Sequence, residues 1–262
     1  MVRWRALTRY TFKGIINLTE QTTDALRTCW LAWLQAELDE SVADVFGYHA
    51  IQLGEPELDG LRANRMPHRW LVDAGGDADA LCEALPFQSN TLDLVVLPHT
   101  LERSLDAHQS LREVERVLVP EGRVIIAGLN PFSLWGLRQR RYDWATRLGI
   151  KSGAKASPFD APVANWIGLW RCRDWLKLLG FEVEVVKRGL YRPAWHSQPW
   201  VDRTAWMEAA GSALWPFAAS AYFLIAVKRV RATRLLGPAW RRQRRLVKVP
   251  VKSSARVRST HE

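Results

Sequence analysis

Cysteine is scarce in this chain of 262 residues, which has only three, at Cys29, Cys82 and Cys172. No two of them form a Cys-x-x-Cys pair, and none joins a histidine cluster with the spacing of metal ligands. The sequence therefore predicts no metal site. We expect reduced, partly buried thiols in a cytoplasmic protein.

Long uninterrupted apolar runs are also missing. The first 13 residues carry four basic side chains, but neither an apolar stretch nor a cleavage site of the signal-peptide type follows them. Residues 209–227 contain no charged residue and approach the length that spans a bilayer. Gly211, Ser212, Pro216 and Ser220 interrupt this segment. We therefore expect a loop that leads into a buried strand at residues 222–227, and no membrane span.

The body of the chain has no excess of charge of either sign. The whole chain has 37 Lys and Arg against 27 Asp and Glu, but 12 of those bases and a single acid, Glu262, lie from Lys228 onward. The preceding residues therefore hold 25 bases and 26 acids. The net charge of +10 belongs to a C-terminal tail without apolar periodicity. Such a tail either attracts polyanions, such as nucleic acid or anionic lipid, or serves as a solubilising end.

What the sequence does have is a regular alternation of apolar segments and turn residues. Strands are expected at residues 48–54, 69–73, 92–97, 123–127, 181–186 and 221–227. Apolar residues at helical spacing predict helices near residues 26–38, 107–118 and 170–179. This order of elements favours an α/β fold.

The middle of the chain gives the clearest pattern. Residues 92–97 form a nearly continuous run of leucine and valine, which is typical of a parallel strand covered on both faces. Asp106 and Gln109 have the spacing of a helix-capping pair. A turn is expected at residues 120–122, and a strand follows it. Strand, helix and strand with short connections predict a right-handed βαβ unit.

Five motifs occur in order within this unit. They are Leu85-Pro86-Phe87, Leu92-Asp93-Leu94-Val95-Val96, His99-Thr100-Leu101-Glu102, Leu111-Arg112-Glu113-Val114-Glu115-Arg116-Val117-Leu118 and Pro120-Glu121-Gly122-Arg123-Val124-Ile125-Ile126. In this order and spacing they resemble the type-11 branch of the class I S-adenosylmethionine (SAM) methyltransferases. The resemblance implies a Rossmann-like sheet, mostly parallel with a final antiparallel strand, and SAM as donor of a methyl group to an unidentified acceptor. Weaker similarity continues at residues 176–183 and 221–229.

The resemblance divides the chain into three parts. These are a helical N-terminal extension (residues 1–44), a methyltransferase-like domain (45–229) and a basic tail (230–262), for which no fixed fold is expected. The family usually has an acidic-Gly-x-Gly-x-Gly loop after its first strand, whereas residues 52–57 here contain one glycine, Gly54. Only 31 positions separate Gly54 from Leu85. We therefore expect the early crossover helices to be shortened or lost.

The resemblance also implies a set of site residues. The cofactor-binding candidates are Gly54, Asp73, Glu83, Ala84, Leu85, Leu97 and Pro98. Asp73 is expected to bind the ribose hydroxyls, or else to serve only as a turn residue before Gly75. Leu81 stands where the family often has an acid, and Glu83 or Asp79 is a substitute for it.

His99 follows the central strand, at the expected rim of the pocket. It either contacts the methionyl part of SAM, acts as a general base, or holds a local hydrogen bond. Tyr191 and His196 are substrate-facing candidates or ordinary loop residues. The tryptophans at positions 195, 200, 206 and 215 either line a substrate pocket or close a core.

Two other functions stay open on this evidence. One is a non-catalytic interaction module that kept the fold and lost the cofactor, which the missing glycines suggest. The other is association with nucleic acid through the basic tail. The space beside Gly54, Asp73 and His99 decides whether the chain can act as a SAM-dependent enzyme, because a plug by Pro56 or a tryptophan would exclude SAM.

Overall fold

The computed structural model describes residues 25–148, 166–191, 204, 207–208, 211 and 215–229. The chain divides into two units, residues 1–230 and 231–262, and all described residues belong to the first. The predicted basic tail, residues 230–262, lies wholly outside the described residues.

The described residues form a six-stranded sheet in the order β2-β1-β3-β4-β6-β5. The strands are β1 (His49–Leu53), β2 (His68–Val72), β3 (Leu92–Pro98), β4 (Leu118–Leu129), β5 (Phe181–Gly189) and β6 (Ala221–Lys228). Strands β2, β1, β3 and β4 are parallel neighbours. Strand β6 runs antiparallel between β4 and β5. The predicted strands and the mostly parallel sheet with an antiparallel final strand are confirmed.

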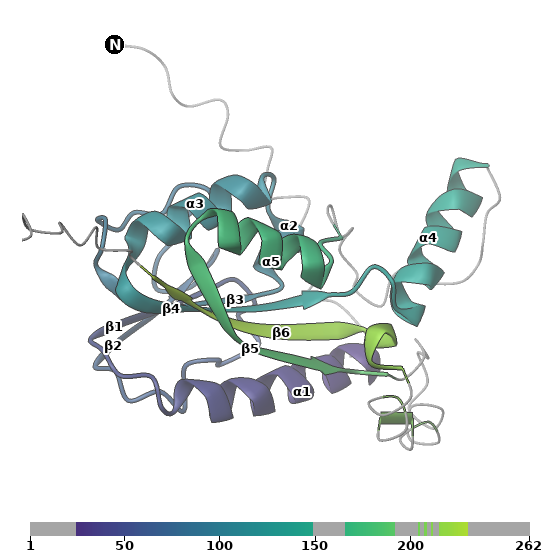
Figure 1. The fold of residues 1–262 in the computed structure, drawn as a ribbon, viewed down its shortest axis with the longest axis horizontal. Helices are drawn as coiled ribbons and strands as arrows, with labels where there is room; N and C mark the ends of the chain where they lie inside the picture. The colour runs from purple at the N-terminus through teal and green to yellow at the C-terminus, as the bar shows by residue number, and fades with distance from the viewer. Residues whose placement is uncertain are drawn as a thin grey trace, which may run out of the picture. The chain divides into compact units, whose positions relative to one another are not determined.

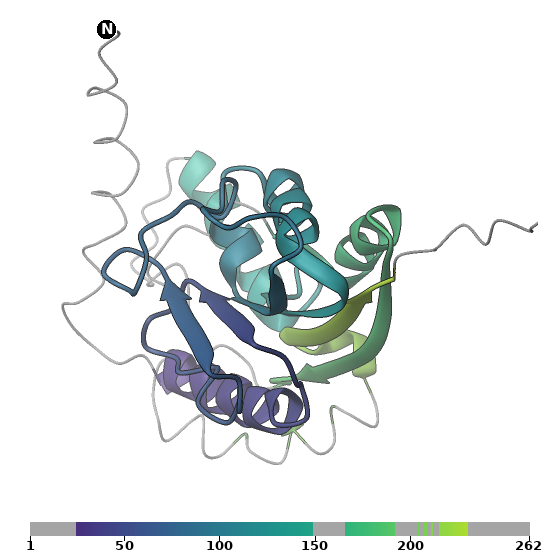
Figure 2. The ribbon, with the colours of Figure 1, turned by 90° about the vertical axis from the view of Figure 1, so that its left-hand side faces the viewer.

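Helices cover both faces of the sheet (Figures 1 and 2). They are α1 (Ala25–Val42), α2 (Thr100–Arg103), α3 (Ala107–Val117), α4 (Leu134–Arg147) and α5 (Leu169–Leu178), with a short 3-10 helix, η1 (Pro216–Ala218), before β6. Helices α2, α3 and α5 lie on one face, and α1 lies on the other. The sequence predicted α1, α3 and α5, but neither α2 nor α4.

Each face of the sheet has its own apolar core. On one face, Trp30 and Leu34 of α1 are buried and pack with Val96 and Phe223 of the sheet. On the opposite face, helices α3 and α5 pack against the alternate residues of the same strands, including Leu97. The N-terminal helix therefore completes the covering of the sheet.

Both early crossover helices are absent from the described chain. Residues 54–67, between β1 and β2, form turns, and so do most of residues 73–91, between β2 and β3. Leu58, Leu61 and Met66 from the first connection enter the core beneath α1. The loop and α1 together cover the surface that a crossover helix would otherwise bury, which confirms the predicted shortening.

The turn predicted at residues 120–122 is part of β4 instead. Leu118 already pairs with Leu92, and the pairing resumes at Arg123 with Leu94 after a shift of register. Glu121 has a left-handed backbone, with φ of 66°. The strand therefore begins five residues earlier than expected and carries the turn residues as an irregularity, because proline cannot supply a ladder hydrogen bond.

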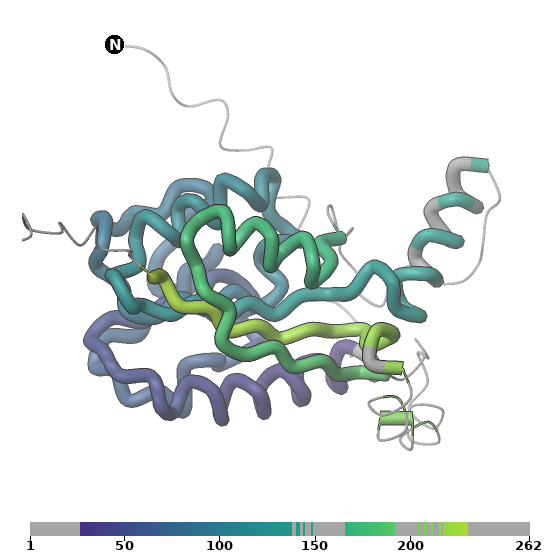
Figure 3. The backbone as a smooth tube through the Cα atoms, viewed as in Figure 1, coloured from purple at the N-terminus to yellow at the C-terminus, as the bar shows by residue number. Residues whose placement is uncertain are grey.

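The segment with the longest uncharged run ends in a strand. Residues 221–228 are β6, which runs between β4 and β5 in the trace of Figure 3. Among the residues that the structure describes, no helix has both the length and the apolarity needed to cross a membrane.

Candidate functional site

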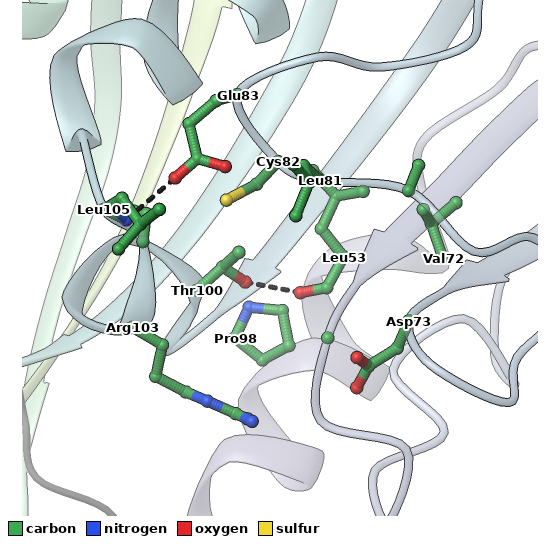
Figure 4. A pocket seen from close by; sticks show the side chains of 13 residues that line it. Leu53, Val72, Asp73, Leu81, Cys82, Glu83, Pro98, Thr100, Arg103 and Leu105 are labelled. Atoms are coloured by element: carbon green, nitrogen blue, oxygen red, sulfur yellow. Dashed lines mark hydrogen bonds between the residues drawn. The ribbon is translucent and has the colours of Figure 1, made fainter. Parts of the chain in front are cut away.

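A cavity opens at the carboxyl ends of the parallel strands. The final residues of β1, β2 and β3, which are Leu53, Val72 and Pro98, all line it (Figure 4). Its volume is about 150 Å³, or about 820 Å³ when the open space at its mouth is included. Small-molecule sites of open α/β sheets occur at this edge.

The loop after β1 borders the cavity at Gly54 but does not fill it. Gly54 has φ of 81°, a conformation that glycine adopts without strain. Its N–H donates to the Val72 carbonyl at 3.0 Å, which links the ends of β1 and β2. A Cβ at Gly54 would lie 3.7 Å from Oγ1 of Thr100 and otherwise meet open space. Backbone therefore borders the cavity closely here.

Gln52 braces this loop from beneath. Its buried Nε2 donates to the carbonyls of Gly54 and Glu55 at 3.0 Å and of Leu58 at 2.8 Å. Its Oε1 accepts the N–H of Gly60 at 2.8 Å. One amide side chain thus fixes a turn that the family usually builds with several glycines.

Neither expected plug fills the cavity. Pro56 is not part of its lining and faces a separate shallow hollow beside Asp59 and Trp70. No described tryptophan lines the cavity either. The space beside Gly54 and Asp73 is therefore open.

Asp73 projects into the cavity from the residue after β2 (Figure 4). Its Oδ1 accepts the N–H of Ala74 at 2.8 Å, and its carbonyl accepts the N–H of Gly76 at 2.9 Å. In the described part of the chain no donor reaches Oδ2. Asp73 therefore shapes the turn and also offers a carboxylate oxygen to a ligand.

Residues 80–83 form the opposite wall. Burial raises the pKa of the Cys82 thiol to about 11, and the Ser110 hydroxyl lies 3.4 Å from its sulfur. Oε1 of Glu83 accepts the N–H of Leu105 at 2.8 Å, so it holds this wall against the turn between α2 and α3. Asp79, the other acidic candidate, is not among the lining residues.

Helix α2 supplies two lining residues that the sequence analysis missed. The Thr100 hydroxyl donates to the carbonyl of Leu53 and joins α2 to the end of β1. The Arg103 guanidinium enters the cavity from the side opposite Asp73 (Figure 4). Arg103 lies 3.7 Å from Glu55, a buried carboxylate that also pairs with Arg27 of α1. The only available signal was their position within and just after the His-x-Leu-Glu motif.

Three of the predicted cofactor residues do not line the cavity. Leu97 is fully buried between the sheet and α3, and Leu85 is buried in the same core. Ala84 is exposed and is not in the lining. Of the seven cofactor candidates, the structure brings Gly54, Asp73, Glu83 and Pro98 together at one cavity.

His99 does not line the cavity. It has a left-handed backbone with φ of 60°, and its ring packs edge-on against Trp30 of α1 at 5.7 Å. Its Nδ1 lies 3.5 Å from Oε2 of Glu102. Oε1 of Glu102 in turn accepts the N–H of Leu129 at 2.9 Å, at the end of β4. This placement makes His99 a buried anchor of α2 and gives it no contact with the cavity.

The other substrate-facing candidates gain no support from their placement. Tyr191 is buried, and its N–H donates to Oε2 of Glu208 at 3.2 Å. Trp215 is exposed. His196 and the tryptophans at positions 195, 200 and 206 lie outside the described residues.

The Leu-Pro-Phe and Arg-Glu-x-x-Arg motifs form one unit. Arg116 of α3 donates to the carbonyl of Leu85 at 3.0 Å and of Phe87 at 2.9 Å. Glu113 accepts the N–H of Leu85 at 3.2 Å. The hydrogen bond from Arg116 holds the pKa of Glu113 below its ordinary value. Distant positions of the sequence pattern thus fix the segment that follows the cavity wall.

Comparison with known proteins agrees with this geometry. The model of a methyltransferase domain family matches residues 64–126, from the approach to β2 into β4. The chain is 32% identical to YafS of Escherichia coli K12, itself uncharacterized, over 187 residues that make up 66% of this chain and 70% of YafS. This chain belongs to the class I methyltransferase family.

This methyltransferase is also similar to a second curated protein and to a solved structure. It is 31% identical over 170 residues to the biotin biosynthesis bifunctional protein BioHC of Saccharophagus degradans, a match that covers 59% of the chain but 29% of BioHC. A solved complex between the Haloferax volcanii Trm112 methyltransferase activator and a methyltransferase is similar with a TM-score of 0.50 and 14% identity. That match covers 80% of this chain and 100% of the other, and shows the shared fold.

Proposed function

We propose that this methyltransferase binds SAM in the cavity at the ends of β1, β2 and β3 and transfers its methyl group to an acceptor. The observation that carries the proposal is the open cavity between Gly54, Asp73 and Arg103. SAM has no phosphate, so a phosphate-cradling loop is not needed. It needs close backbone approach, a carboxylate for the ribose hydroxyls and an apolar slot for adenine.

The residues present suit each of these needs. Gly54 offers backbone without a side chain, and Oδ2 of Asp73 is available for ribose. Val72 and Leu81 supply apolar surface for adenine. Arg103 offers a positive charge for the methionyl carboxylate, held in place by Glu55. The donor set therefore matches a molecule with a carboxylate, a ribose and a base.

Bound SAM supplies a methyl group that its sulfonium already activates. The work left to the chain is to bind and orient the donor and to exclude water. Leu81 and Leu105 flank the mouth and are exposed, so they are placed to lose water contact when a ligand enters. No protein group is required to form a covalent bond.

Isothermal titration of the full chain with SAM and with S-adenosylhomocysteine (SAH) tests the proposal. We expect Asp73→Ala to weaken SAH binding by about tenfold or more, because hydrogen bonds to a charged group are lost. Asp79→Ala, an exposed acid off the lining, is the matched control and should bind SAH as the wild type does. Absence of heat at roughly millimolar SAH would refute the assignment.

The open cavity also bears on the non-catalytic alternative. That alternative was motivated by the missing glycines of residues 52–57, and Gln52 accounts for how the turn forms without them. Neither Pro56 nor any described tryptophan lines the cavity, which favours cofactor binding over this alternative.

A further inference from the structure

A second cavity opens at the same edge of the sheet, where β4 ends. Its lining begins with Asn130 and Pro131, directly after Leu129, and includes Arg188 near the end of β5. Strand β4 is the parallel neighbour of β3, whose last residue lines the cofactor cavity. Both cavities therefore open along the same edge of the sheet. The second cavity has a volume of about 590 Å³, or about 1210 Å³ when the open space at its mouth is included.

The charge of this cavity is of one sign. Among the described residues, Arg140 of α4, Arg171 of α5 and Arg188 of β5 line it, and no acidic one does. Within the described ranges, none of the three guanidinium groups forms an ion pair with a carboxylate. Three cations without a counter-charge repel one another, and an anion placed among them relieves that repulsion.

The start of α5 adds to this positive potential. Gly168 is the N-cap residue and has no side chain to bond the first-turn N–H groups. Gly168 and the first three residues of the helix all line the cavity. Unbonded N–H groups at a helix start favour negative charge. The arginines and the helix start therefore act on the same space.

Exposed aromatic rings surround the charges. Arg140 lies over the ring of Phe132 at 5.5 Å, and Arg188 lies over the ring of Phe217 at 5.9 Å. Asn130 fixes this frame, because its Nδ2 donates to the Phe217 carbonyl and its Oδ1 accepts the N–H of Phe132, at 2.9 and 3.0 Å. Phe132 and Phe217 are 74% and 67% exposed, so their apolar surface is available to a ligand.

We propose that this arginine cavity binds the methyl acceptor, and that the acceptor is an acidic molecule with an aromatic or other apolar part. Its acidic group is a carboxylate or a phosphate, which pairs with Arg140 and Arg188 while its apolar part packs on the phenylalanine rings. The acceptor role rests on the proposed function. In the transfer, the acceptor's nucleophilic atom bonds to the methyl carbon as the sulfur–carbon bond breaks, SAH leaves, and the acceptor's proton passes to water.

The test uses three small probes of similar shape with the full chain: phenyl phosphate, benzoate and the neutral benzyl alcohol. By titration calorimetry we expect at least one anion to bind and benzyl alcohol to bind at least tenfold more weakly. Arg188→Gln and Arg140→Gln should each weaken the anion about tenfold and leave SAH affinity unchanged. Arg112→Gln, an exposed position on α3, removes the same charge elsewhere and should change neither.

Each outcome decides the proposal. Which anion binds more tightly identifies phosphate or carboxylate as the recognised group. Failure of both anions to bind, equal binding of benzyl alcohol, or wild-type affinity in both arginine variants would overturn the inference. Should Arg188→Gln fail to melt cooperatively, Arg140→Gln on α4 decides. Anion binding without SAH binding would refute the proposed function and leave the anion site standing, and the reverse result would do the opposite.

Discussion

Lys228 makes a testable contribution to stability. It is the first of the basic residues concentrated toward the C-terminus, but it is the last residue of β6 and its side chain is only 9% exposed. Its Nζ donates to the carbonyls of Glu115 at 2.6 Å and Leu118 at 2.9 Å, and to Oδ1 of Asn90 at 3.1 Å. It therefore closes the carboxyl end of α3, the helix that also holds the Leu85 segment.

Lys228→Met keeps the aliphatic stem and removes the three donors. Hydrogen bonds to a charged group contribute about 1.5–3 kcal/mol each, and the desolvation of the ammonium offsets part of that gain. The ion pair with the partly exposed Glu115 adds under about 1 kcal/mol. We therefore expect a loss of about 3 kcal/mol in the free energy of unfolding, measured by urea denaturation with an unchanged m-value.

Lys187→Met is the matched control, because Lys187 lies on the neighbouring strand β5 and pairs with Glu37 and Glu40 while one third exposed. Surface pairs of this kind contribute roughly 1 kcal/mol or less. Equal destabilisation by the two variants would show that the hydrogen bonds of Lys228 do not stabilise the end of α3.

Three further predictions concern the cavity and its supports. Gly54→Val and Gly180→Val both place a side chain on left-handed backbone, with φ of 81° and 84°. Each should lower the free energy of unfolding by at least about 1–2 kcal/mol. Only Gly54→Val should also weaken SAH binding in calorimetry. Because the pKa of Cys82 is about 11, its alkylation by iodoacetamide, followed by mass spectrometry, should still accelerate above pH 10 and slow when SAH is bound; a plateau near pH 9 would contradict this. The hydrogen bond from Arg116 lowers the folded-state pKa of Glu113 below 4.5, so its stabilisation is complete above that pH and is lost as pH falls through the folded value. The urea midpoint of Glu113→Gln should therefore fall less than that of the wild type on acidification below about pH 4.5, and parallel curves would count against it.

The sheet was predictable because its strands are marked by local composition. Residues 92–97 and 221–227 are apolar on both faces, which only a covered central strand requires. Helix α4 was missed because Leu134, Leu137 and Trp144 are exposed, so its apolar residues do not mark a buried stripe. Helix α2 has one turn, which is too short for a periodic pattern.

Apart from Glu83, the predicted residues that line the cavity lie at the end of a strand or directly after it. Gly54, Asp73 and Pro98 line the cavity because parallel strands bring their carboxyl ends to one edge. His99 is the next residue after β3, and its left-handed backbone directs the ring toward α1. Two successive residues at the end of β3 therefore have different neighbours: Pro98 lines the cavity, and His99 packs against α1. Arg103 acts through contacts with distant parts of the chain, which a local pattern does not record.

The hydrogen bonds of Gln52 beneath the loop after β1 bear on the conformational entropy that the chain loses on folding. A loop of several glycines must surrender many backbone conformations, whereas a loop with one glycine and Pro56 begins from fewer. The shape of the loop that borders the cavity consequently depends on a single amide and the carbonyls that accept its hydrogen bonds. Such a loop is more rigid than a glycine-rich one, but its shape depends on one side chain, Gln52.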